Sequence, residues 1–172
     1  RLVVLTAMDA REHGATVLTR TRCSKLERSA DHWLATLVHT DGEETRVKAV
    51  AAVNATGPWV DRFVDEATAV PARWHPRMVK GSHIVVPKLF DHEFAYIFRS
   101  PDGRVVFAIP YEREFTLIGT TEKDHAGDLA TPSIEEPEID YLLDMANRYF
   151  RRELSRKDVV WTFAGLRPLL AD

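Results

Sequence analysis

The pattern of apolar and polar residues in the first third of the chain predicts one helix followed by short strands. Apolar residues recur at roughly helical spacing over residues 1–13, and Gly14 then ends the pattern. Beyond Gly14, apolar and polar residues alternate, which is typical of strands, and Asp41-Gly42 is a strong hairpin turn. The strands predicted here cover residues 15–19, 23–30, 33–39 and 44–53.

A strand that runs directly into a helix is predicted next. Residues 47–57 are mostly apolar and end in a glycine, and Pro58 then suits the first position of a helix. The apolar side chains of residues 59–66 share one face of that helix. The sequence therefore predicts an apolar strand, a small-residue turn and a helix in immediate succession.

The segment 67–76 separates this region from a second one that is rich in strands. It contains two prolines and no apolar period, so we place a domain boundary within it, between residues 1–70 and residues 71–172. The strands of the second region are predicted over residues 78–86, 94–98, 104–110, 114–119 and 159–164.

The clearest helix of the chain is predicted over residues 133–150. Its apolar residues fall on one stripe, as expected of a helix that packs on a sheet. Ser133 and Glu136 have the spacing of a capping box, while Pro137 favours a helix that starts near Glu136. Helices placed among antiparallel strands define an α+β fold class.

Composition and charge exclude several classes of protein. The chain has 172 residues, 23 of them basic and 26 acidic, and the net charge of −3 argues against a nucleic-acid binder. No apolar stretch reaches the roughly 18 residues that span a bilayer. Cys23 is the single cysteine, which excludes an internal disulfide and a cysteine-based zinc site and favours a reducing compartment. The start at Arg1, without methionine or a signal-peptide pattern, leads us to expect a fragment of a larger protein.

Three segments carry residue types that could bind a ligand. Each also fits a plain structural role, a turn or the start of a strand. A strand that ends in small residues allows a ligand to approach the backbone closely, and a histidine can act as a base near neutral pH. Hydroxyls that follow a glycine can bind a polar ligand. The three segments are Asn54-Ala55-Thr56-Gly57, Lys80-Gly81-Ser82-His83 and Gly119-Thr120-Thr121.

Arg167 is the strongest candidate for an anion-binding residue. It lies between apolar neighbours after an apolar strand, where an unpaired cation is expensive to bury. Its partner is either a carboxylate of the protein or a phosphate or carboxylate of a substrate, and the sequence leaves both open. Glu122, Asp124 and His125 form a loose carboxylate–histidine cluster, from which we expect no metal site.

Taken together, these segments resemble the FAD-dependent glycerol-3-phosphate dehydrogenases of the amine- and glycine-oxidase-like flavoproteins. The stretches that carry the resemblance follow the order of the family and span nearly the whole chain. The Lys-Gly-Ser-His-Ile and Gly-Leu-Arg-Pro-Leu pieces are specific, whereas Ala-Thr-Gly is shared by many flavoproteins. The matching stretches are 18–22, 53–60, 79–87, 115–122 and 160–169.

The resemblance implies a two-domain flavoprotein. Residues 1–70 would be part of a Rossmann-like FAD domain, and residues 71–172 would be most of an antiparallel β-sheet cap with helices that binds the substrate. Two departures stand out: the Gly-x-Gly-x-x-Gly dinucleotide fingerprint is absent, and Glu122 stands where the family often has aspartate.

The resemblance also implies an activity and a set of site residues. The activity is oxidation of sn-glycerol 3-phosphate to dihydroxyacetone phosphate by hydride transfer to FAD, with electrons passed on to a quinone. His83 and Arg167 would be catalytic, and Thr120, Thr121 and Arg167 would bind the substrate. The residues expected near FAD are Cys23, Ala55, Thr56, Gly57 and Ser82.

Location, partners and two alternative functions complete the expectations. The family places the enzyme in the cytoplasm, with peripheral association to the inner membrane and a homodimer as compatible states, and no nucleic-acid partner is expected. One alternative is a glycerol-phosphate oxidase that passes electrons to oxygen. The other is a scaffold or regulatory remnant that binds no flavin.

Overall fold

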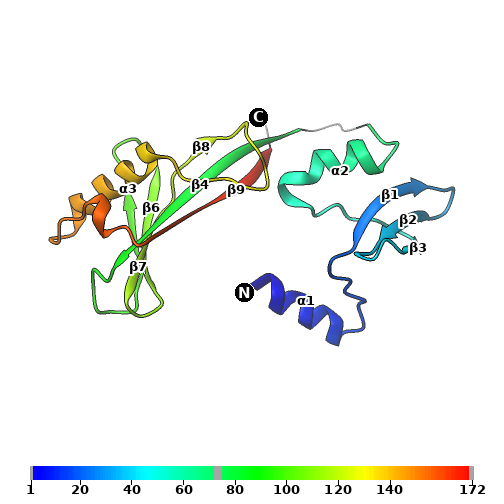
Figure 1. The fold of residues 1–172 in the computed structure, drawn as a ribbon, viewed down its shortest axis with the longest axis horizontal. Coiled ribbons are helices and arrows are strands. Elements are labelled where there is room, and N and C mark those ends of the chain that lie inside the picture. Colours follow the sequence, from blue (N-terminus) through cyan, green and yellow to red (C-terminus); the bar gives the residue numbers. More distant parts are fainter. Residues whose placement is uncertain (1, 72–74, 171–172) are drawn as a thin grey trace. The chain divides into compact units, whose positions relative to one another are not determined.

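The computed structural model describes residues 2–71 and 75–170 and divides the chain into two compact units. The first comprises Arg1–Thr56 with Val60–Arg73, and the second comprises Gly57–Trp59 with Trp74–Asp172. Helices and antiparallel strands occur in both units, which confirms the expected α+β class (Figure 1). Among the described residues, no helix has the length and apolar character needed to cross a membrane.

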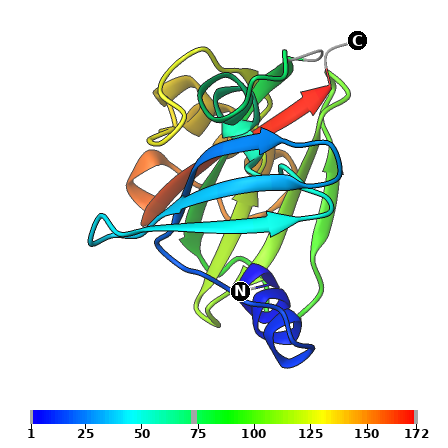
Figure 2. The same cartoon turned by 90° about the vertical axis from the view of Figure 1, so that its right-hand side faces the viewer.

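The first unit is built on a three-stranded antiparallel meander. The strands lie in the order β1-β2-β3, side by side, and Asp41-Gly42 turns the chain between the last two (Figure 2). The guanidinium of Arg22 and the carboxylate of Glu66 form an ion pair of 3.0 Å that links the meander to the second helix of the unit. The elements are α1 (Leu2–Glu12), β1 (Arg22–Arg28), β2 (Trp33–Val38), β3 (Glu44–Ala49) and α2 (Val60–Ala67).

Two strand predictions in this unit are wrong. Residues 15–19 form no strand, and β3 ends at Ala49, so that residues 50–56 lack the regular structure predicted over 47–57. A strand needs a neighbour for its backbone N–H and C=O groups. Among the described residues no strand lies beside these two segments, and the apolar side chains of Val50 and Val53 are 86% and 88% exposed.

The second unit is a six-stranded sheet with one long helix on it. The strand order is β5-β6-β7-β4-β8. The strand β9 pairs with the edge of β4 opposite to β7, so β4 is central to the sheet. The elements are η1 (Gly57–Trp59), β4 (Pro76–Pro87), β5 (Tyr96–Arg99), β6 (Val105–Tyr111), β7 (Phe115–Gly119), β8 (Lys123–Asp124), α3 (Glu136–Tyr149), η2 (Arg156–Asp158) and β9 (Trp161–Leu170).

The helix α3 covers one face of this sheet and makes the core with it (Figure 1). Leu142 and Met145 of α3 pack with apolar side chains of the central strands, because alternate residues of a strand point to the same face. The strand residues in this cluster are Ile84, Val86, Val106, Ala108 and Ile118.

The N-terminus of α3 differs from the predicted capping box. The helix begins at Glu136 with Pro137 in its first turn, as expected. However, the side chain of Glu138, not that of Glu136, accepts a hydrogen bond of 2.9 Å from the backbone N–H of Glu135, and Ser133 contributes no cap. A helix start at Glu136 makes Glu135 the N-cap, which moves the box two residues along the chain.

The last strand is longer than the predicted 159–164. β9 runs to Leu170 and stays paired with β4 through Gly165↔Gly81 and Arg167↔Val79. The segment 165–168 therefore lies inside the sheet. The long central strand supplies hydrogen-bonding partners along its whole length, and these override the turn-forming tendency of glycine and proline.

Candidate active site

Strand pairing brings the predicted catalytic residues onto one face of the six-stranded sheet. His83 of β4 is paired with Gly119 of β7 on one side and with Phe163 of β9 on the other. Directly paired residues of antiparallel strands point to the same face. Gly81, two residues before His83 on β4, points to this face as well, because side chains alternate along a strand. We call this face, which is turned away from α3, the site face. Its members include Gly81, His83, Phe107, Gly119, Trp161, Phe163 and Arg167.

The imidazole of His83 is half-buried and held by its neighbours. Its ring lies parallel to that of Phe163, with centroids 4.8 Å apart and an interplanar angle of 6°. Burial, and then the positive charge of Arg167, lower the pKa of His83 below its ordinary value. The imidazole is therefore neutral at neutral pH and able to accept a proton.

One nitrogen of this imidazole has an unmet hydrogen-bonding capacity. Nδ1 of His83 is buried and has no hydrogen-bond partner among residues 2–71 and 75–170. A buried polar atom without a partner is unusual and costs free energy. The site face thus carries a neutral histidine, one of whose ring nitrogens is buried and has no hydrogen-bond partner among the described residues.

Arg167 and Thr120 lie against the glycine at position 81. A methyl group at Gly81 would come within 2.5 Å of Thr120 Oγ1 and 3.0 Å of Arg167 Nη2, so that any other residue would push these groups away. Nη2 of Arg167 donates a long hydrogen bond of 3.4 Å to the carbonyl oxygen of Thr121. Within the described part of the chain, Arg167 forms no ion pair with a carboxylate, which leaves its charge available for an anionic ligand.

A pocket of about 280 Å³ opens beside these two side chains. It carries the guanidinium groups of Arg104 and Arg167 and the carboxylate of Glu122, all within the second unit. Arg104 is already engaged, because it pairs with Asp102 and lies 4.0 Å from the centroid of the Tyr141 ring. The residues that line the pocket are Gly103, Arg104, Val105, Phe107, Thr120, Glu122 and Arg167.

Sequence reasoning missed the contribution of β6 to this pocket. Val105 and Phe107 alternate with the buried residues Val106 and Ala108, which marks them as facing away from α3. Residues 105–109 are all apolar, so the sequence itself shows no alternation that would have placed Phe107 on the site face.

Ser82 and Thr121, both predicted as ligand-binding residues, have their hydroxyls on the other side of the sheet. Ser82 is fully buried, and its hydroxyl donates a hydrogen bond of 2.9 Å to Glu138 Oε1. The hydroxyl of Thr121 donates to the same oxygen at 2.7 Å and accepts the backbone N–H of Ser82 at 2.9 Å. The structure therefore brings His83, Arg167 and Thr120 together, but not the hydroxyls of Ser82 and Thr121.

The residues predicted to lie near the cofactor in the loop after β3 form a compact turn. The side-chain oxygen of Asn54 accepts hydrogen bonds from the backbone N–H of Thr56 at 3.3 Å and from its hydroxyl at 2.7 Å. Gly57 has a φ of +59°, which favours glycine. Ala55 and Thr56 are exposed, and their backbone is accessible.

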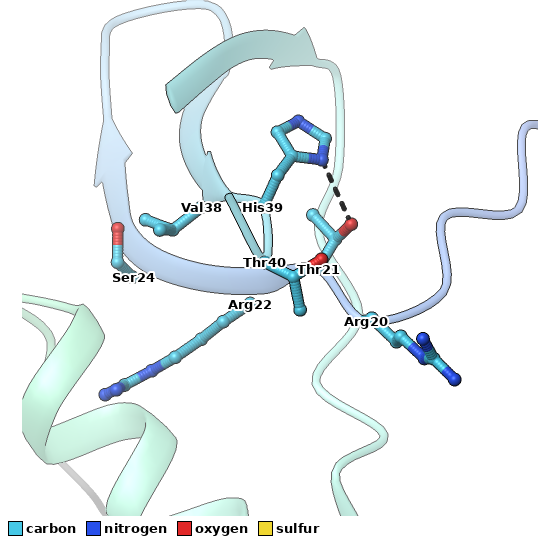
Figure 3. Close-up of a pocket in the computed structure, with 7 residues that line it drawn as sticks. All are labelled: Arg20, Thr21, Arg22, Ser24, Val38, His39 and Thr40. Atoms are coloured by element: carbon cyan, nitrogen blue, oxygen red, sulfur yellow. Dashed lines mark hydrogen bonds between the residues drawn. The ribbon is translucent and has the colours of Figure 1, made fainter. Parts of the chain in front are cut away.

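Cys23 lies on β1 with its thiol directed to the backbone. Its Sγ donates to the carbonyl of Lys25 at 3.5 Å, and burial raises the pKa of the thiol, so the sulfur is protonated and unreactive at neutral pH. Neighbouring residues line a pocket of about 470 Å³, in which the Thr21 hydroxyl meets a ring nitrogen of His39 at 3.3 Å (Figure 3). The pocket is lined by Arg20, Thr21, Arg22, Ser24, Val38, His39 and Thr40.

Two members of the carboxylate–histidine cluster after β7, Asp124 and His125, make hydrogen bonds with other groups of the chain. Asp124 accepts a hydrogen bond of 2.6 Å from Arg77, and a ring nitrogen of His125 lies 3.0 Å from the carbonyl oxygen of Asp128. In the part of the chain that the structure describes, no three His, Cys, Asp or Glu side chains are grouped in a way that could hold a metal ion.

Comparison with known proteins defines the class to which this fold and site belong. The sequence matches the family described as FAD dependent oxidoreductase over residues 1–172, and the chain belongs to that family. It is 48% identical to a glycerol-3-phosphate dehydrogenase of Pseudomonas aeruginosa and 42% identical to a D-erythritol 1-phosphate dehydrogenase of Brucella abortus. Each alignment covers the whole chain but 34% of the relative, so the chain spans about a third of their length.

A solved structure agrees with this assignment. The chain superposes on the glycerol-3-phosphate dehydrogenase of Bacillus halodurans, solved in complex with FAD, with a TM-score of 0.80 and 30% sequence identity. The match covers 95% of this chain and 34% of that one.

Proposed function

We propose that this chain supplies the substrate site of an FAD-dependent enzyme that oxidises sn-glycerol 3-phosphate to dihydroxyacetone phosphate. The observation that carries the proposal is the neutral imidazole of His83 beside the unpaired guanidinium of Arg167 on one sheet face. A base next to an anion-binding cation is what the oxidation of a phosphorylated alcohol requires. The names of the relatives from Pseudomonas and Bacillus support this substrate.

The residues of the site face fit a flavin. Phe107, Trp161 and Phe163 expose apolar rings there, at 36%, 57% and 36%, which gives a flat aromatic ring system an apolar surface to pack on. When FAD is bound, it supplies the two-electron acceptor for the hydride that leaves C2 of the substrate.

We assign the proton transfer and the anion binding to two side chains. His83 accepts the proton of the C2 hydroxyl, since its lowered pKa keeps the ring neutral. Arg167 holds the phosphate or stabilises the negative charge that develops on the reacting oxygen, and Thr120 adds a hydroxyl beside it.

We assign the two units to two roles. The second unit corresponds to the substrate-binding cap predicted over residues 71–172, although it also includes Gly57–Trp59, and the first corresponds to the part of the FAD domain predicted over residues 1–70. The backbone of Cys23, Ala55 and Thr56 in the first unit, and that of Gly57 directly after them in the chain, would lie along the cofactor. The exposed, small-residue turn at 54–57 supports close approach of a ligand to the backbone.

We further propose that the reduced cofactor passes its electrons to a quinone. This assigns the enzyme to the cytoplasm, with peripheral association to a membrane surface, and is compatible with a homodimer. An oxidase that uses oxygen is the alternative for the acceptor. The relative named for erythritol 1-phosphate supports a second candidate substrate, a longer polyol phosphate.

Anaerobic reduction of the full-length protein tests the proposal. Purified protein is mixed with glycerol 3-phosphate, and the visible absorption of oxidised flavin is followed. Bleaching is expected, and bleaching with erythritol 1-phosphate alone would replace the substrate. A bound flavin that neither compound bleaches would contradict the substrate class, and protein without flavin would favour a scaffold. Peroxide released in air in step with substrate oxidation would identify the oxidase.

A further inference from the structure

Glu138 is a buried carboxylate that the proposed reaction does not use. It is 7% exposed and lies in the first turn of α3, behind the site face. Its two oxygens accept four hydrogen bonds. Oε1 accepts from the hydroxyls of Ser82 and Thr121 at 2.9 and 2.7 Å, and Oε2 accepts from Lys80 Nζ at 2.8 Å and from the Glu135 backbone at 2.9 Å.

The charges of this cluster balance one another. Burial alone would lower the pKa of Lys80, but the hydrogen bonds that its ammonium group donates to Glu135 and Glu138 outweigh burial and raise the pKa. Burial alone would raise the pKa of Glu138, but Lys80, Thr121 and Ser82 hold it below its usual range. Both groups are therefore charged at neutral pH and form a fully satisfied buried pair.

Thr121 connects this cluster to the site face. Its hydroxyl is bound to Glu138 on the helix side of the sheet. Its carbonyl oxygen accepts the hydroxyl of Thr120 at 3.0 Å and Nη2 of Arg167 at 3.4 Å. Thr121 thus joins the buried carboxylate to Thr120 and Arg167, two of the polar residues that line the pocket.

The same cluster also holds the backbone at Gly81, which lies beneath the side chains of Thr120 and Arg167. Gly81, against which Thr120 and Arg167 lie, is flanked by Lys80 and Ser82, and both neighbours are bound to Glu138. The backbone of Ser82 and Thr121 is joined directly as well, since Thr121 N–H donates to the Ser82 carbonyl at 3.2 Å. A shift of Glu138 would therefore move the strand and the loop that carry the anion-binding groups.

We propose that Glu138 and Thr121 are positioning residues that fix Arg167 and Thr120 in the orientation that binds the phosphorylated substrate. This inference rests on the proposed function, in which Arg167 binds the substrate anion. It assigns the buried cluster a role in substrate affinity, in addition to its contribution to folding.

Thr121→Val in the full-length holoenzyme is the first test. The change removes the hydroxyl while keeping the shape of the side chain. We expect the KM for glycerol 3-phosphate to rise about tenfold with a much smaller change in kcat, since loss of one oriented charged contact is of that order. Thr121→Ser keeps the hydroxyl and should restore KM to within about twofold of the wild type.

Thr116→Val is the matched control. Thr116 is also a buried threonine of this region, and its hydroxyl accepts a hydrogen bond of 3.1 Å from the Leu89 backbone, away from Arg167. Both valine variants should lower the apparent Tm, but Thr116→Val should leave KM unchanged. An equal rise of KM in both would show a merely structural role and overturn the proposal.

A double variant tests whether Thr121→Val raises KM by displacing Arg167. On an Arg167→Lys background, Thr121→Val should raise KM by less than about twofold, because the group that it positions is already replaced. A full tenfold further rise would overturn the proposal. Glu138→Gln should reproduce the KM effect of Thr121→Val, and if that variant fails to fold, the threonine series decides alone.

A chemical probe separates failure of this inference from failure of the proposed function. If the wild type does not oxidise glycerol 3-phosphate, the proposed function fails, but the reactivity of Arg167 toward phenylglyoxal can still be followed by peptide mass spectrometry. Modification of Arg167 should be several-fold faster in Thr121→Val than in Thr116→Val. Equal rates would show that Thr121 does not hold Arg167 and would overturn the inference.

Discussion

His83 lies flat against Phe163, with the two ring centroids 4.8 Å apart and the planes inclined by only 6°. On its other side, the imidazole occupies the space that the missing side chain of Gly119 leaves open, since a methyl group there would lie 2.2 Å from His83 Cδ2. The ring is therefore held between two strands by an aromatic contact and a glycine. Such packing fixes the direction of a catalytic base without using either of its nitrogens.

The charge of Arg167 should set the acid limit of activity. His83 acts as a base only when neutral, so activity falls when the pH drops below its pKa, and burial together with Arg167 lowers that pKa. Arg167→Gln removes the positive charge and should raise the pKa. The acid limb of log kcat/KM should then move to higher pH, in addition to an overall loss of activity.

The measurement is a kcat/KM profile across the acid and neutral range, each variant normalised to its own plateau. Arg104→Gln changes another arginine of the same pocket and controls for a general loss of positive charge. An acid limb that stays in place in Arg167→Gln would show that His83 is not the titrating base.

Gly119→Ala should reduce activity far more than Gly165→Ala. The new methyl group at position 119 would collide with the His83 ring, whereas at Gly165 no atom lies within 4 Å of the added carbon. Both glycines lie on the site face, so the pair isolates the contact with His83. A displacement of about 1 Å costs on the order of 100-fold in rate, and we expect a fall of kcat/KM of that size for Gly119→Ala.

Near wild-type activity in Gly165→Ala, with a similar apparent Tm, completes the expected result. If both alanine variants keep full kcat/KM, the imidazole tolerates displacement and its packing has no catalytic meaning.

The sequence was sufficient to locate β4, β5, β6, β7 and β9 of the second unit, but not β8, and to single out Gly81, His83, Gly119 and Arg167 of the site face. The pattern of β4 is strong because both of its faces are largely buried. The wrong strand predictions at 15–19 and 47–57 have a different origin. Their apolar character is real, but among the described residues no neighbouring strand pairs with them.

The directions of Ser82 and Thr121 were harder to predict. Side chains alternate along a strand, so Ser82 and His83 must point to opposite faces, and the sequence alone does not tell which face α3 covers. Glu138 was missed because the capping box was assigned to Ser133 and Glu136. Once Glu138 is placed in the box, its carboxylate lies next to Lys80, Ser82 and Thr121.

Leu142→Ala should destabilise the fold without altering the site. Leu142 is fully buried where α3 packs on the sheet, and its truncation leaves a cavity that costs about 2–5 kcal/mol. Asp144→Ala, an exposed position on the same helix, is the control and should change stability by less than about 0.5 kcal/mol. Thermal unfolding of the full-length protein measures both, and an equal Tm for the two variants would place Leu142 outside the core.

Stability at acid pH should depend on Glu138. Folding lowers its pKa below the ordinary glutamate value of 4.5: burial opposes this shift, but the hydrogen bonds from Lys80, Thr121 and Ser82 outweigh burial. A carboxyl whose pKa is depressed by folding stabilises the fold above its unfolded pKa, and this contribution is lost as the pH falls through the folded value. The apparent Tm of the wild type should therefore decline below about pH 4.5, where the unfolded carboxyl begins to bind its proton.

In Glu138→Gln the apparent Tm should be lower than that of the wild type at neutral pH and should decline less steeply as the pH falls. Loss of two of the four hydrogen bonds should cost about 1–3 kcal/mol at pH 7, while a side chain that cannot titrate removes one source of the acid dependence. Glu153→Gln, at an exposed glutamate, should follow the wild-type curve at every pH. Parallel curves for Glu138→Gln and the wild type would show that the proton uptake of acid unfolding occurs elsewhere.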